Sequence, residues 1–249
     1  MNLSKVGCPR RLLRLPSIPL RGEMMFSRIL GTAGVVFAAI ALAVAADPYP
    51  TTKPTPSKSA KQSVSFQNGV KDYTGTVDLE IWAVAPNTCL EGNINASSDA
   101  DNDGGESQIL VRFDDLFGTA PGKIPANSAV HSATLVIGAF DEGSTVHLHR
   151  MLVPFKKTST WNSLVGGISA DGKEASRQKD GFTFGKISAS TSAIPFDVTD
   201  TVQAWANGSA NHGWVFINTG GNGWDFYTSE FDDVKQRPKL TVEFSPPKE

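Results

Sequence analysis

Apolar and polar residues alternate with a period of two along much of this chain. In residues 109–114, Ile, Val and Phe alternate with Leu, Arg and Asp, and similar alternation recurs in residues 146–149 and 239–244. This pattern is typical of strands with one buried face. Residues 133–140 are apolar at nearly every position, which predicts a central strand with Gly138 at a bulge or a close approach of two backbones.

One amphipathic helix interrupts the strand pattern. Asp200 can cap its start, with Gln203 three residues later, and Gly208 can end it, while Val202 and Trp205 share its apolar face. Glycine-rich turns separate the predicted strands throughout. We therefore expect an all-β fold, an antiparallel two-sheet β-sandwich of the jelly-roll type, with this short helix at one end.

The N-terminal part of the chain differs from the rest. Residues 29–46 are nearly all apolar, follow Arg28 and end in small residues. A membrane-spanning helix would need about 20 apolar residues flanked by anchoring side chains, so a secretory signal peptide is the better interpretation. We expect a protein that is secreted or held at the cell surface, with no membrane span after cleavage.

These features divide the chain into three parts. Residues 1–46 form the predicted signal region, with Met24 or Met25 as candidate starts. Residues 47–62, rich in Pro, Thr, Ser and Lys, are expected to be an extended linker. Residues 63–245 contain no further linker and are long enough for one domain with a large core.

Removal of the leader changes the charge balance. Residues 1–46 hold six of the 23 Lys and Arg and one of the 25 Asp and Glu, which leaves 17 basic and 24 acidic residues. This acidic balance argues against a nucleic-acid partner. Cys89 would then be a lone cysteine, expected to be a buried small hydrophobe rather than a reactive thiol, and no disulfide framework is predicted.

Eight short strings occur in a recognisable order between residues 72 and 242. They are DYTGTVDLEI (72–81), LVRFD (110–114), ATLV (133–136), TW (160–161), FDVTDTVQAW (196–205), NHGW (211–214), TSE (228–230) and RPKLTV (237–242). Together they resemble the DNRLRE domain, an exported β-sandwich of bacteria and archaea similar to carbohydrate-binding module family 96. The resemblance implies a jelly-roll fold and an extracellular role in binding polysaccharide, with alginate-like polymers among the known ligands of the family.

Sugar recognition usually uses a flat aromatic face together with polar groups. Trp224 and Tyr227 follow a glycine-rich turn and have polar neighbours, so they are the main stacking candidates. Trp82, Trp205 and Trp214 are expected to be core residues.

A second candidate contact lies in a polar loop. Trp161 could stack on a sugar there, or pack as part of a lid on the end of the sandwich. Lys156 and Lys157 would be the local basic patch for an acidic glycan.

Two sets of side chains are candidates for metal binding. Asp99, Asp101 and Asp103 match the start of an EF-hand calcium loop, but position twelve is Leu110, so we expect either a calcium site that also uses Glu106 or a solvated acidic loop.

His147 and His149 lie two apart and so on one face of a strand. They are candidates for metal binding or, with Arg150, for glycan contact, although an exposed polar strand face explains them more simply.

The chain contains none of the common catalytic motifs. It has no G-x-S-x-G, no H-E-x-x-H and no phosphate-binding loop. A polysaccharide-binding module is therefore the leading hypothesis. A structural or adhesive surface protein with extracellular protein partners is the first alternative, and a polysaccharide lyase or hydrolase is the second.

Overall fold

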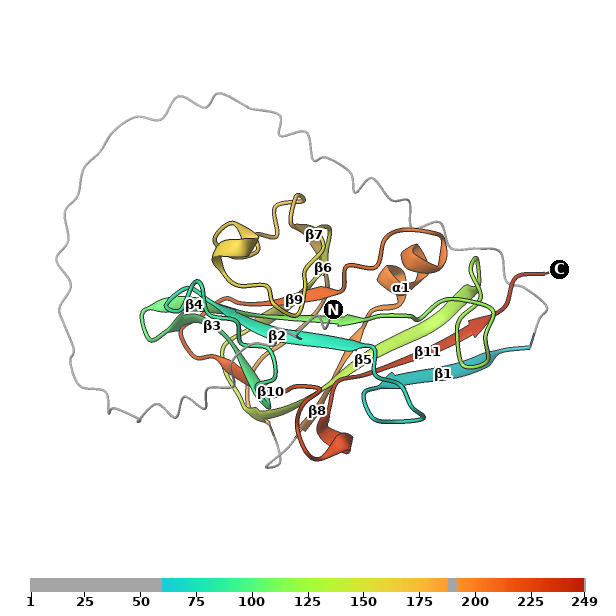
Figure 1. Cartoon of the computed structure of the whole chain (residues 1–249), viewed down its shortest axis with the longest axis horizontal. Coiled ribbons are helices and arrows are strands. Elements are labelled where there is room, and N and C mark those ends of the chain that lie inside the picture. Colours follow the sequence, from blue (N-terminus) through green and yellow to red (C-terminus); the bar gives the residue numbers. More distant parts are fainter. Residues whose placement is uncertain (1–59, 188–191, 249) are drawn as a thin grey trace, which may run out of the picture. The chain divides into compact units, whose positions relative to one another are not determined.

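The computed structural model describes residues 60–187 and 192–248, which consist largely of antiparallel β-strands (Figure 1). The strands are β1 (Gln62–Gln67), β2 (Thr76–Trp82), β3 (Asn95–Asn102), β4 (Gly105–Phe113), β5 (Ala129–Asp141), β6 (Val146–Met151), β7 (Ala175–Thr183), β8 (Ser192–Asp197), β9 (Trp214–Asn218), β10 (Trp224–Tyr227) and β11 (Lys239–Ser245). One α-helix, α1 (Thr199–Ala206), and two 3-10 helices, η1 (Asn162–Leu164) and η2 (Val234–Gln236), complete the described elements. The expectation of an all-β antiparallel fold with one short helix is confirmed.

The strands form a hydrogen-bonded sheet that curls into a half-barrel. Its order is β1-β11-β5-β10-β3-β4-β9-β6-β7, with β2 paired to β4 and β8 paired to β5. The long strand β5 pairs with β11 over its first part and with β10 near its end. β3 pairs with β10 at its start and with β4 at its end, so it carries the sheet around the bend.

The half of the curled sheet that contains β4 and the half that contains β5 share one apolar core on their inner faces. The predicted inward residues of β4, Ile109, Val111 and Phe113, pack in one cluster with inward residues of β5 and β11 such as Leu135 and Leu240. Burying each such side chain is worth roughly 1.5–3 kcal/mol. Burial of these inward residues, which recur with a period of two in the sequence, therefore provides the main driving force for the curled sheet.

Residues 152–174, here called the lid segment, cover the outer face of the half that contains β4. Phe155 and Ile168 of the lid segment pack there with Leu110 in a second buried cluster. The buried Gln108 side chain fixes the lid segment, since its Nε2 donates to Ile168 O at 2.9 Å and its Oε1 accepts from Ile168 N at 2.8 Å. Leu110 was expected on the polar face of its strand, but it is buried because the lid segment covers that face.

Helix α1 lies above β5 in Figure 1, and its residues Val202 and Trp205 belong to the inner core cluster. Its N-cap is Val198, so the prediction that Asp200 caps the helix was wrong, and Asp200 lies in the first turn instead. The Gln203 side chain takes no part in the N-cap. It is buried, its Oε1 accepts from Val130 N at 2.8 Å and its Nε2 donates to Ser128 O at 3.1 Å. The capping pattern assigned the Gln203 side chain to the end of the helix. Its amide instead makes hydrogen bonds to residues around the start of β5.

Two glycines occupy positions that the sequence indicated. At Gly138 a Cβ would lie 2.4 Å from Gln236 O, so the predicted close approach of two backbones is confirmed. Gly208 follows α1 with a φ of +101°, a left-handed conformation that suits the end of a helix.

The three tryptophans that were expected in the core differ from one another in burial. Trp205 and Trp214 are buried, whereas Trp82 is half-buried and donates from Nε1 to Asn102 O at 3.0 Å. Cys89 is also only half-buried, so the expectation that it is a buried small hydrophobe was wrong.

The predicted signal region, residues 1–46, lies outside the described residues, as do residues 47–59 of the predicted linker. The first described strand begins at Gln62 and the last ends at Ser245. Within the described part of the chain, no helix has the length and apolar character needed to cross a membrane.

Candidate functional site

Trp224, the first predicted stacking residue, is part of the core. It is 1% exposed, and its Nε1 donates to Ser144 O at 2.6 Å. The strand β10 begins directly at this residue, and its alternation turns Trp224 and Phe226 inward. The prediction that Trp224 stacks on a sugar was therefore wrong, because the glycine-rich turn ends one residue before a buried strand.

Tyr227 is half-buried at the end of β10. Its ring stacks on Phe231 at a centroid distance of 3.8 Å and contacts Phe140 at 4.6 Å. Protein side chains therefore cover much of the ring surface that a sugar would need. The contacts connect Tyr227 to the segment that leads from β10 to β11.

The other predicted sugar contacts lie in the lid segment. Trp161 is half-buried and packs over Gly167, where a Cβ would be 2.6 Å from the indole. It packs against the second buried cluster, as the alternative interpretation of a lid proposed. Lys156 and Lys157 are exposed, and Lys157 Nζ lies 4.0 Å from Glu91 Oε1.

The predicted calcium ligands lie along the β3–β4 hairpin. They are Asp99, Asp101, Asp103 and Glu106. Asn102 pairs with Gly105, and the two residues between them have φ values of +53° and +87°, as in a type I′ turn. These residues lie in an extended hairpin, whereas a calcium loop of the EF-hand type curls around its ion. Among the described residues, no three His, Cys, Asp or Glu side chains are grouped so that they could hold a metal ion.

His147 and His149 lie in β6, as expected for a strand, but they differ in exposure. His149 is buried, with Nδ1 2.8 Å from Ser176 O, whereas His147 is half-buried with its ring centroid 6.5 Å from that of Phe182. Burial lowers the pKa of both imidazoles, and the nearby Lys179 ammonium lowers it further. Both rings are therefore neutral at neutral pH, and His147 is the one that a ligand can reach.

Two exposed phenylalanines lie beside His147 at the end of β7. Phe182 is 55% exposed and Phe184 is 65% exposed. Their ring centroids are 5.9 Å apart and their planes differ by 17°. We call this pair the Phe platform. Leaving two large rings in water forgoes roughly 1.5–3 kcal/mol of burial each, so an exposed apolar pair of this kind marks a candidate binding surface.

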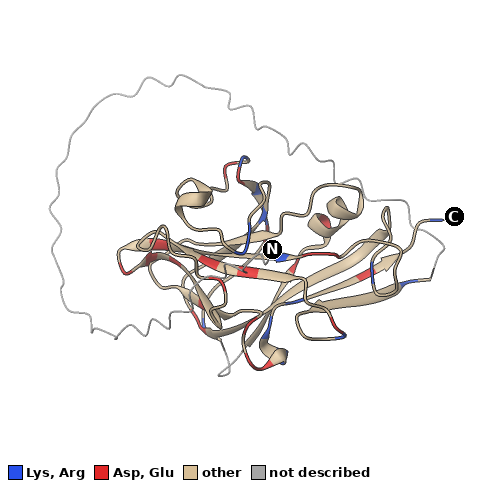
Figure 2. Cartoon of the chain, in the orientation of Figure 1, with Lys and Arg blue, Asp and Glu red and all other residues tan. Residues whose placement is uncertain are grey.

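Basic side chains accompany the Phe platform. Lys179 Nζ lies over the Phe182 ring, 5.7 Å from its centroid, and Lys186 is exposed just beyond the pair. The one acidic residue of β7, Asp180, faces inward, since its Oδ2 accepts from Trp214 Nε1 at 2.6 Å. Figure 2 shows basic residues on β7, whereas acidic residues lie on β2 and the β3–β4 hairpin. The edge of the sheet at β7 is thus locally basic.

Two carboxyl groups, the buried Asp78 and the half-buried Glu80, project from the inner side of β2. Asp78 accepts from Ser229 N at 2.7 Å and from Ser229 Oγ at 2.9 Å, and Glu80 Oε2 accepts from Ser97 N at 2.9 Å. Burial raises the pKa of Asp78 to about 6 and the pKa of Glu80 to about 8, with the Asp225 carboxylate adding to the latter. Strand β2 is hydrogen-bonded to β4 through its backbone. The side chains of Asp78 and Glu80 connect β2 in addition to the segment after β10 and to β3.

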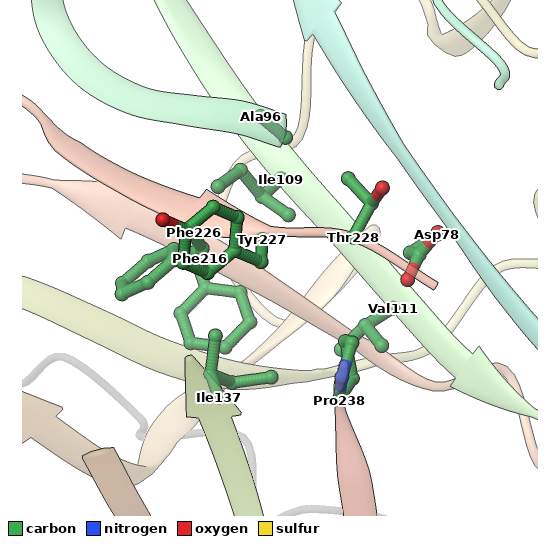
Figure 3. Close-up of a pocket in the computed structure, with 10 residues that line it drawn as sticks. All are labelled: Asp78, Ala96, Ile109, Val111, Ile137, Phe216, Phe226, Tyr227, Thr228 and Pro238. Carbon is green, nitrogen blue, oxygen red and sulfur yellow. The ribbon is translucent and has the colours of Figure 1, made fainter. Parts of the chain in front are cut away.

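Asp78 also lines a small pocket (Figure 3). The other lining residues are mostly apolar and are Ala96, Ile109, Val111, Ile137, Phe216, Phe226, Tyr227, Thr228 and Pro238. The rings of Phe216 and Phe226 lie together, and the Asp78 carboxylate and Thr228 lie on the other side. The space holds about one water molecule, which is too small for a sugar. The Phe platform is therefore the better candidate site.

No protein-family model matches this chain, and no curated protein is found to be similar to it. The resemblance to the DNRLRE domain thus stays a prediction, and the candidate site depends on its own geometry.

The sequence arguments missed the Phe platform because they weighed Trp and Tyr as stacking residues and left out Phe. A usable signal was present in residues 179–186, KDGFTFGK, where two aromatic residues two apart lie between lysines. Residues two apart in a strand share a face, so this spacing predicts a paired aromatic surface with flanking cations.

Proposed function

We propose that this domain is a non-catalytic carbohydrate-binding module that holds an acidic polysaccharide on the Phe platform. The observation that carries the proposal is the pair of exposed, nearly parallel rings of Phe182 and Phe184 with Lys179 beside them. Flat apolar rings can stack on the CH faces of sugars, while an ammonium group can pair with a carboxylate or sulfate. The basic edge on a chain of acidic balance would orient an anionic polymer toward β7.

We also propose that the half-barrel is a jelly-roll β-sandwich of the DNRLRE type, carried by a secreted or cell-surface protein. Two observations support this: the inner faces of the two halves share one core, and an apolar stretch follows Arg28 near the N-terminus. The module would bind polysaccharide and would need no nucleic-acid partner.

Affinity electrophoresis of the purified protein tests the proposal. Gels would contain polygalacturonate, alginate or neutral hydroxyethylcellulose, each run with calcium and with EDTA. We expect retardation by an acidic polymer that persists in EDTA and is lost in Phe182→Ala. Val84→Ala is the matched control, because this apolar residue is exposed to a similar degree and lies beside Gly105 of the β3–β4 hairpin, and it should keep the retardation of the wild type.

Other outcomes would point to the alternatives. Unretarded migration in every gel would refute the proposal and favour a structural or adhesive surface protein that uses the same rings against another protein. Release of soluble oligosaccharides during a long incubation would show a lyase or hydrolase instead of a binding module.

A further inference from the structure

The two rings of the Phe platform are displaced sideways from each other. A centroid separation of 5.9 Å with planes only 17° apart is the geometry of an offset pair, in which neither ring fully covers the other. Phe182 lies in β7, and Phe184 lies one residue beyond the end of that strand. Each ring therefore offers its own stacking area, and the two areas follow one another along the chain.

The surroundings of the platform are open. Phe182 and Phe184 are 55% and 65% exposed, and β7 is the last strand in the order of the described sheet. The pocket of Figure 3 is lined by neither residue. An open surface at a sheet edge does not enclose the end of a polymer, but an extended chain can pass across it.

A lysine precedes and a lysine follows the two rings in the sequence. Lys179 Nζ lies 5.7 Å from the Phe182 centroid, and the His147 ring meets the same phenylalanine edge-on at 6.5 Å. Lys186, which is also exposed, follows Phe184 by two residues. The order of features along residues 179–186 is thus cation, first ring, second ring, cation.

We infer that the Phe platform binds two consecutive sugar units from the interior of an extended polysaccharide chain, one unit on each ring, with an acidic substituent of the chain beside Lys179. This inference rests on the proposed function and adds to it the length of the bound segment. A single sugar would occupy one ring and leave half of the stacking surface in water. A two-unit ligand is therefore the smallest that gains both contacts.

Calorimetric titration of the full-length protein with galacturonate and mannuronate oligomers of one to six units tests this inference. We expect the affinity to rise by roughly tenfold or more from one unit to two for the oligomer that binds. Phe182→Ala and Phe184→Ala should each remove this rise, whereas Phe184→Tyr, which keeps a ring, should preserve it. Both phenylalanines are more than half exposed, so the variants should fold, and circular dichroism checks this directly.

The outcomes separate this inference from the proposed function. If the wild-type protein is retarded by an acidic polymer but binds one unit as tightly as two, the two-ring mode is refuted and the binding module stands. The same holds if Phe184→Ala leaves the affinity for two units unchanged. If no polymer retards the wild type, the proposed function itself fails.

Discussion

Glu80→Gln should make this protein less sensitive to alkaline pH. Glu80 projects from the inner side of β2, where it is half-buried and its Oε2 accepts from Ser97 N at 2.9 Å. Burial is the main cause that raises the pKa of Glu80 to about 8, and the negative charge of Asp225 adds to it. Gln keeps a carbonyl oxygen for the Ser97 N–H bond and cannot ionise, so the substitution removes the titration while it preserves the shape.

The size of the effect follows from proton linkage. A glutamate with the ordinary pKa of 4.5 releases its proton in the unfolded chain well before Glu80 does in the folded one. Each pH unit between the two values corresponds to about 1.4 kcal/mol, so the free energy of unfolding loses at most about 5 kcal/mol through this group. Because the folded pKa is the higher one, the contribution is fully present below pH 4.5 and is lost as the pH rises through about 8.

Urea unfolding at pH 5, 7 and 9 measures this dependence. The wild type should lose several kcal/mol between pH 5 and pH 9, with Asp78 contributing in the same direction because burial raises its pKa to about 6. Glu80→Gln should lose markedly less and should be more stable than the wild type at pH 9. Glu243→Gln, at an exposed position in β11, is the control that should follow the wild type. The same decline in Glu80→Gln as in the wild type would show that the reasoning about this buried carboxyl is wrong.

Three further substitutions test the packing of the fold by urea unfolding at neutral pH. Gln108→Leu should lower the free energy of unfolding by about 2–4 kcal/mol, because it leaves the Ile168 N–H and C=O without their partners. It should also speed proteolysis of the lid segment, and unchanged proteolysis would mean that Gln108 does not hold the lid segment. Val165→Gly should raise the free energy of unfolding by about 0.5–1 kcal/mol, since Val165 is 94% exposed with a φ of +60°, a costly conformation for a β-branched residue; a loss of stability would contradict this. Gly138→Ala should cost about 2 kcal/mol or more, because its Cβ would meet Gln236 O at 2.4 Å, and a neutral result would show that the two backbones separate easily.

Much of the fold could be read from local patterns. The inward residues Ile109, Val111 and Phe113, the close approach at Gly138 and the end of the helix at Gly208 were all predicted, because each depends on a short stretch of chain and its period. The predictions failed where distant segments decided the outcome. Leu110 is buried by the lid segment, which follows it by more than 40 residues in the chain.

The candidate site was harder to predict than the fold. Trp224 and Tyr227 were selected by their polar neighbours, yet Trp224 begins a buried strand and Tyr227 is covered by Phe231. Phe182 and Phe184 look like ordinary core residues in the sequence, since most phenylalanines are buried. Their exposure arises because β7 lies at an edge of the curled sheet.

Local patterns in the chain are enough to specify a domain of antiparallel strands with one short helix. The period of two selects the strand conformation locally, and glycine-rich turns allow the chain to reverse. Contacts between distant segments set which face of each strand a second layer covers, which carboxyls are withdrawn from water and which aromatic rings remain exposed. Burial depends on segments that are far apart in the chain, and the alternation within one strand carries no information about what packs against its second face.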